Sequence, residues 1–114
     1  MRAFSSETAQ TSVENGLDIG RWTQYPAARN FPFGAMWYSV PAGEASEQDV
    51  HPEVELAVVV AGRARFVAPD GSGIEAGVGT AVLLDSEEPH VVQNLSDHEP
   101  VTVLSVYWMP TDGE

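Results

Sequence analysis

Four residues with metal-binding side chains stand at alternate positions near the middle of the chain: Asp49, His51, Glu53 and Glu55. In an extended strand, alternate side chains point to the same face, so these oxygen and nitrogen donors converge. His90 begins another strand-like run much later in the chain. Imidazole and carboxylate donors, without thiolates, form a ligand set for zinc, Fe(II), manganese, nickel or cobalt.

Strands are needed to hold these donors, and the sequence predicts a series of short ones separated by turns. The predicted strands cover residues 35–40, 53–60, 63–68, 81–84, 90–95 and 101–108. Residues 69–73 (PDGSG) have the composition of a hairpin turn. No segment shows a helical period. Many short strands with frequent turns are typical of a small β-sandwich or barrel, and the length of 114 residues predicts one domain.

The composition argues against several kinds of partner and chemistry. Seventeen acidic residues against five basic ones give a formal charge of −12, which repels a phosphate backbone, so we expect no nucleic-acid partner. The same charge and the lack of a long apolar run predict no membrane association. The chain has no cysteine, which excludes disulfides and thiol catalysis. The polar N-terminus has no signal-peptide pattern, so a cytoplasmic location is the default expectation.

Two stretches resemble the motifs of the cupin superfamily, the small double-sheet jelly rolls. The first motif has two histidines separated by one residue, then a glutamate and a glycine; His51, Glu55 and Gly62 match it, and Asp49 stands in place of the first histidine. The second motif runs from a glycine to a histidine and an asparagine, and Gly79, His90 and Asn94 match it. Asp85 and Glu87 replace its usual proline and glycine.

This resemblance implies an all-β fold, the cupin-type double-stranded β-helix or jelly-roll barrel. The polar, unpatterned start of the chain predicts a flexible N-terminal arm (1–15), which forms a strand only when another segment captures it. A cupin domain (16–110) and a C-terminal tail (111–114) follow. The resemblance also implies one divalent metal ion, zinc first and iron, manganese or nickel as alternatives. The implied ligands are Asp49, His51, Glu55 and His90. In a second interpretation, His51, Glu55 and His90 bind the ion and Asp49 lies behind them.

Further residues are candidates for catalysis or substrate contact. Glu53 and Glu88 are candidate acids or bases beside the predicted ligands. Tyr38 and Trp37 point to opposite faces of one predicted strand, so one should be in the core and the other in the cavity; we take Tyr38 as a catalytic candidate. Arg63 and Arg65 share a face and are candidate anchors for an anionic substrate.

Three functions follow as hypotheses. The first is a metal-dependent enzyme on a small polar metabolite, with Lewis-acid chemistry such as isomerisation, elimination or rearrangement. Similarity to small cupins of bacterial secondary metabolism extends this to biosynthesis, including N–N bond formation. The second is an Fe(II)-dependent oxygenase that uses His51, Glu55 and His90. The third is a non-catalytic cupin that binds a small molecule. The resemblance to cupins also implies a homodimer, and residues 17–33 are the candidate interface.

Overall fold

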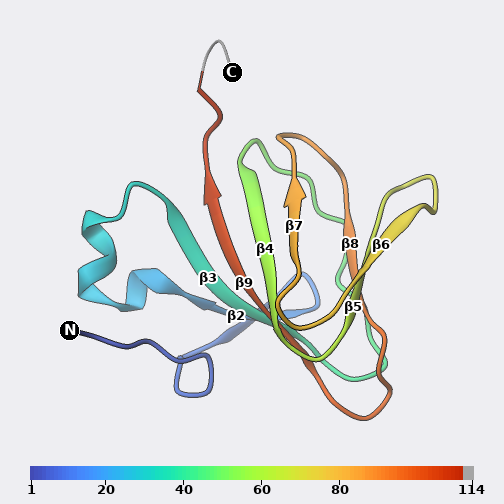
Figure 1. Ribbon diagram of the computed structural model, residues 1–114, viewed down its shortest axis with the longest axis horizontal. Coiled ribbons are helices and arrows are strands. Elements are labelled where there is room, and N and C mark those ends of the chain that lie inside the picture. The colour runs from blue at the N-terminus through green and yellow to red at the C-terminus, as the bar shows by residue number, and fades with distance from the viewer. Residues whose placement is uncertain (112–114) are drawn as a thin grey trace.

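A computed structural model describes residues 1–111 and shows nine strands and two short 3-10 helices over this range (Figure 1). The elements are β1 (Ser12–Glu14), β2 (Leu17–Arg21), η1 (Trp22–Gln24), η2 (Pro26–Asn30), β3 (Gly34–Val40), β4 (Val54–Ala61), β5 (Ala64–Val67), β6 (Gly73–Ala76), β7 (Ala81–Leu84), β8 (Val91–Asn94) and β9 (Val101–Trp108). The predicted C-terminal tail lies outside the described residues from residue 112 on. None of the described helices is long and apolar enough to cross a membrane.

The strands form two sheets that enclose the core. One sheet has the order β1-β2-β3-β9-β4-β7, and the other has the order β6-β5-β8. All neighbours in both sheets are antiparallel. Figure 1 shows the smaller sheet beside the β4 and β7 side of the larger one, with η1 and η2 outside the sheets next to β3. The all-β architecture predicted from the sequence is therefore confirmed.

Alternation along the central strands builds the core. β4 and β9 each alternate between buried and less buried residues, as expected for strands with one face on a core. The innermost side chains are small or β-branched; Val59 pairs with Val103, and both are fully buried. The paired residues toward the other end of the barrel are Glu55 and Tyr107. The interior therefore changes from apolar at one end to polar at the end that holds the donors.

The N-terminal segment contributes a hairpin at this polar end. Asn15 and Gly16 join β1 to β2, and both have positive φ values, 52° and 76°. Two such residues in a two-residue loop match the turn that suits the twist of a β-hairpin. Ser12–Glu14 is thus captured as an edge strand by β2, the alternative that the sequence analysis gave for the arm. The predicted boundary between residues 15 and 16 falls inside this turn.

A second cluster of aromatic side chains packs outside the barrel. The indole of Trp22 contacts the rings of Phe4, Tyr25, Phe31 and Trp37, with ring centroids 5.2 to 6.1 Å apart. The indole N–H of Trp37 donates to the Tyr25 hydroxyl. This cluster holds η1, η2 and the start of the chain against β3, whose other face lines the barrel.

Candidate metal centre

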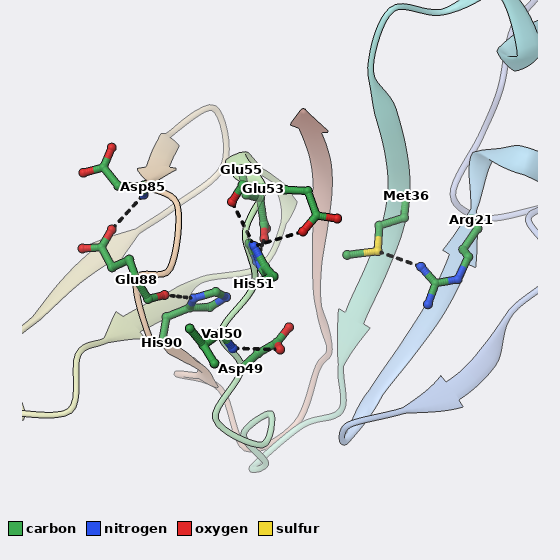
Figure 2. Close-up of polar contacts among 10 residues, drawn as sticks. All are labelled: Arg21, Met36, Asp49, Val50, His51, Glu53, Glu55, Asp85, Glu88 and His90. Carbon is green, nitrogen blue, oxygen red and sulfur yellow. Dashed lines mark hydrogen bonds and ion pairs between the residues drawn. The ribbon is translucent and has the colours of Figure 1, made fainter. Parts of the chain in front are cut away.

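Asp49, His51 and His90 come together at the polar end of the barrel (Figure 2). One ligand atom of each residue lies within 4.8 Å of the other two. Asp49 and His51 precede β4, and His90 immediately precedes β8. The two segments meet because Asp49 and His90 form an isolated antiparallel bridge. The main chain, not only the side chains, therefore sets the spacing of the donors.

Each histidine is oriented by a main-chain carbonyl two residues away in the sequence. His51 Nδ1 lies 3.0 Å from the carbonyl oxygen of Glu53, and His90 Nδ1 lies 2.9 Å from that of Glu88. A carbonyl oxygen only accepts, so both Nδ1 atoms donate a proton. In the neutral rings, both Nε2 atoms then carry a lone pair. This is the arrangement by which proteins fix the tautomer and the ring orientation of metal-binding histidines.

The contact between His51 and Glu55 is the strongest indication that a cation fits here. His51 Nε2 lies 3.0 Å from Glu55 Oε1, and Glu55 is almost completely buried, at 4% exposure. With its proton on Nδ1, a neutral His51 would place a lone pair against a carboxylate. A second proton on His51 resolves this, and so does a metal ion.

The pKa of His51 reflects this charge pattern. Burial alone would lower the pKa of His51. Four effects together outweigh burial: the hydrogen bond to the Glu53 carbonyl, the charge of Glu55, the hydrogen bond to Glu55 and the charge of Asp49. The net result is a raised pKa. The surroundings thus stabilise positive charge at the Nε2 side of His51, which a bound cation also supplies.

A cavity of about 240 Å³ opens beside Asp49 and His51, whereas His90 lies outside its lining. Asp49, His51, Glu53 and Glu55 line one part of its wall. Glu53 is the more accessible carboxylate beside His51: its side chain is 36% exposed, and its Oε1 lies 4.0 Å from His51 Nδ1. The structure therefore places the predicted acid or base Glu53 in the cavity, next to the donor group.

Tyr38 lies deeper, at the boundary between the core and the site. It is 3% exposed and lines a small cavity together with Asp49, Glu55 and His90. Burial, and then the charge of Glu55, raises the pKa of Tyr38 well above its ordinary value. The phenol is protonated at neutral pH even at its ordinary pKa, and this shift widens the pH range over which it can act as a hydrogen-bond donor. Trp37, on the opposite face of β3, belongs to the outer aromatic cluster.

Other sequence candidates lie apart from the donor group. The Glu88 carboxylate accepts from the amide of Asp85, and Glu88 touches His90 through its main-chain carbonyl (Figure 2). Arg63 immediately precedes β5 and Arg65 lies within it, in the smaller sheet. Arg63 Nη2 lies 3.7 Å from Glu75 Oε2, and Arg65 donates to the main-chain carbonyl of Gly71. These arginines do not line the site cavity.

The cavity is also lined by residues that were not singled out for the site from the sequence, among them Arg21 and Met36. Arg21 is on β2, which the sequence analysis did not identify as a strand. The signal was present, because Asn15-Gly16 is a hairpin turn and Leu17, Ile19 and Arg21 alternate after it. Tyr107 lies in the last predicted strand, and the structure places it in the cavity wall.

Comparison with known proteins agrees with this architecture. The cupin domain model of the Cupin_2 family matches residues 36–107. The chain therefore belongs to the cupin family. No curated protein matches it.

Solved structures of cupins share the fold over nearly the whole chain. A Cupin 2 conserved barrel domain protein from Salinispora arenicola is 30% identical, with a TM-score of 0.80 over 95% of this chain and 88% of that one. A protein from Photorhabdus luminescens is 24% identical, with a TM-score of 0.79 over 95% and 86%. The polyketide cyclase RemF from Streptomyces resistomycificus is 17% identical, with a TM-score of 0.75 over 94% and 78%.

Proposed function

We propose that this cupin is a metal-dependent enzyme that acts on a small polar metabolite by isomerisation, elimination or rearrangement. The observation that carries the proposal is the His51–Glu55 contact at 3.0 Å, with the Nδ1 atoms of both histidines already bonded to carbonyl oxygens. Asp49, His51 and His90 are the proposed ligands, with Glu55 as the fourth. Similarity in fold to a polyketide cyclase supports the idea that such a barrel can hold an enzyme site.

A divalent ion at this position supplies Lewis acidity, which polarises a carbonyl or hydroxyl oxygen and acidifies bound water. The side chains and carbonyls around this position have separate roles. Glu53 accepts or returns a proton at its exposed carboxylate, because it lies in the cavity wall beside His51. Tyr38 offers a neutral phenol as a hydrogen-bond donor in the small cavity that it shares with Glu55 and His90. The carbonyls of Glu53 and Glu88 hold the two imidazoles in place.

Elemental mass spectrometry of the purified protein tests the metal site. We expect about one equivalent of a divalent metal per chain, lost in His51→Ala. His98→Ala is the matched control, because His98 is highly exposed and pairs with Asp97 in another loop. Absence of metal from the wild type, even after reconstitution with zinc, iron and manganese, would overturn the metalloenzyme proposal.

Incubation of the metal-loaded protein with a small-molecule extract tests catalysis. The proposed chemistry predicts a product equal in mass to its substrate, or lighter by one water, with zinc as well as with iron. Ligand binding without any turnover would instead make the protein a binding cupin. Both measurements are needed because a metal site alone does not define a reaction.

One observation favours a second candidate, an Fe(II)-dependent oxygenase. Two histidines and one carboxylate, as in Asp49, His51 and His90, are the ligand types of non-haem iron oxygenases when other positions stay open. Our preference for Lewis-acid chemistry rests on Glu55 as an additional ligand, which leaves fewer open positions. Oxygen consumption that depends on substrate and iron, with an inactive zinc form, would establish the oxygenase instead.

A further inference from the structure

Arg21 stands in the wall of the site cavity, on the other side from Glu53 and Glu55. Leu17, Ile19 and Arg21 alternate along β2, and all three line the cavity. Arg21 is paired in register with Met36 on β3, which also lines the cavity. Figure 2 shows β3 between β2, which carries Arg21, and the strands beside His51.

The guanidinium of Arg21 forms few hydrogen bonds with other residues. Its Nη2 lies 2.8 Å from Glu14 Oε1, and its Nη1 lies 3.9 Å from the sulfur of Met36. The side chain is 47% exposed. Arginine has five N–H donors in a planar fork, and a single carboxylate oxygen with a distant thioether leaves most of them available. Glu14 comes from β1, an edge strand of three residues held by β2 alone.

Charge around the cavity makes Arg21 distinctive. Among the described residues that line the cavity, Arg21 is the one arginine or lysine, whereas four are carboxylates: Glu14, Asp49, Glu53 and Glu55. An anionic group entering the cavity is therefore repelled nearly everywhere except at Arg21 and at a bound cation. Both a carboxylate and a phosphate can accept two parallel hydrogen bonds from the planar fork, but a carboxylate fits this acidic cavity better because it adds less negative charge.

Strand order sets the distance between the two attractive positions. Arg21 is on β2 and Glu55 is on β4, and the sheet order places β3 and β9 between them. Three interstrand steps correspond to roughly 14 Å along the sheet, which curvature and inward side chains shorten. The wall near Arg21 includes the apolar side chains of Ile19 and Met36. The cavity therefore suits a molecule with two polar ends joined by a hydrocarbon spacer.

We propose that Arg21 is the specificity residue that binds a carboxylate of the substrate, and that Glu14 occupies the guanidinium when substrate is absent. The substrate class is then a carboxylic acid whose other end carries the oxygen that reaches the metal position. This inference rests on the proposed function for the metal end only; the contacts of Arg21 stand independently of it. Glu14 and Arg21 should have opposite effects on binding, because one competes with the substrate and the other holds it.

Calorimetric titration with succinate, glutarate and adipate, each compared with its monoamide, tests the proposal. The zinc-loaded wild type should prefer at least one diacid over its monoamide by about tenfold, the effect of one charge-assisted contact. Arg21→Gln should abolish this preference, Arg21→Lys should restore part of it, and Glu14→Gln should tighten diacid binding. Arg63→Gln is the matched control, because Arg63 also pairs with a glutamate but lies outside the cavity. Thermal unfolding of each variant checks that it is folded.

The outcomes separate the two proposals. Diacid binding that needs zinc but is unchanged in Arg21→Gln would overturn the role of Arg21 and leave the metal site intact. Binding that needs Arg21 but is the same without zinc would support Arg21 and contradict the metal end. Equal weakening in Arg21→Gln and Glu14→Gln would show that the ion pair is merely structural. The proposal would also be overturned if none of the three diacids binds better than its monoamide in a way that depends on Arg21.

Discussion

Asp49 and His90 exchange both of their main-chain hydrogen bonds, with N to O distances of 2.9 and 3.0 Å. In an antiparallel pair of this kind, opposite side chains lie on the same side of the ladder. The bridge therefore fixes two proposed ligands before any cation is present. It also joins the segment before β4 to the start of β8, so the donor group spans the two sheets.

Substitution of Asp49 by asparagine should distinguish the two ligand sets. The amide side chain keeps an oxygen that can accept from the main-chain N–H of Val50, as Asp49 Oδ1 does now, but it loses the charge. We expect zinc affinity to fall by about tenfold or more in Asp49→Asn, measured by competition with a chelator. Glu47→Gln, an exposed carboxylate nearby, should leave affinity unchanged. Loss of affinity in Glu55→Gln but not in Asp49→Asn would favour His51, Glu55 and His90 as the ligands.

The stability of the metal-free protein should depend on pH through His51. The folded-state pKa of His51 is raised, so its protonation stabilises the fold. This contribution is fully present below the unfolded pKa of about 6.5 and is lost as pH rises through the folded value. Zinc requires unprotonated imidazole, so zinc-induced stabilisation should instead grow as pH rises. Thermal unfolding of wild type and His51→Asn, with and without zinc, from about pH 5 to pH 8 measures both trends; parallel trends would contradict this account.

Tyr38 has a structural role that can be separated from its proposed chemical one. It is 3% exposed and belongs to the core, so Tyr38→Ala should lower the free energy of unfolding by about 3–5 kcal/mol. Tyr38→Phe keeps the ring and should retain the fold and the metal. Turnover of the substrate found in the extract assay should fall in Tyr38→Phe if the phenol assists the reaction. Denaturant titration and metal analysis of both variants provide the comparison, and unchanged turnover in Tyr38→Phe would remove Tyr38 from the mechanism.

Gly34 should be required for the position of Tyr107 in the cavity wall. The two residues are paired across β3 and β9, and a Cβ at Gly34 would overlap the Tyr107 ring. Gly34→Ala should destabilise the fold by about 1–3 kcal/mol, as overpacked core substitutions do. In a Tyr107→Ala background the same substitution should cost much less. Denaturant unfolding of the two single variants and the double variant measures this coupling, and an undiminished cost would show that the strain arises elsewhere.

The central strands and the metal-type donors could be predicted from the sequence because their signals are local. β3, β7 and β9 closely follow the apolar runs predicted at residues 35–40, 81–84 and 101–108, which are bounded by turn residues. Spacing of Asp49, His51 and Glu55 placed these donors on one face of an extended chain. His90 was a candidate from its residue type, and the family resemblance implied that it binds the same ion as His51, although no local pattern joins the two. β1, β2 and β6 were missed as strands: β1 and β6 are short and mostly exposed, whereas β2 follows a hairpin turn at Asn15-Gly16 that was not recognised.

Tertiary structure alone decided which long-range neighbours complete the site. The bridge between Asp49 and His90 and the carbonyl contacts of both histidines depend on how the two segments dock, which strand parity does not specify. Glu88 shows the limit of reasoning from position: it is two residues from His90, yet its carboxylate bonds to the amide of Asp85. Arg21 shows the converse, because it is far from His51 in sequence but lines the same cavity through the curl of one sheet.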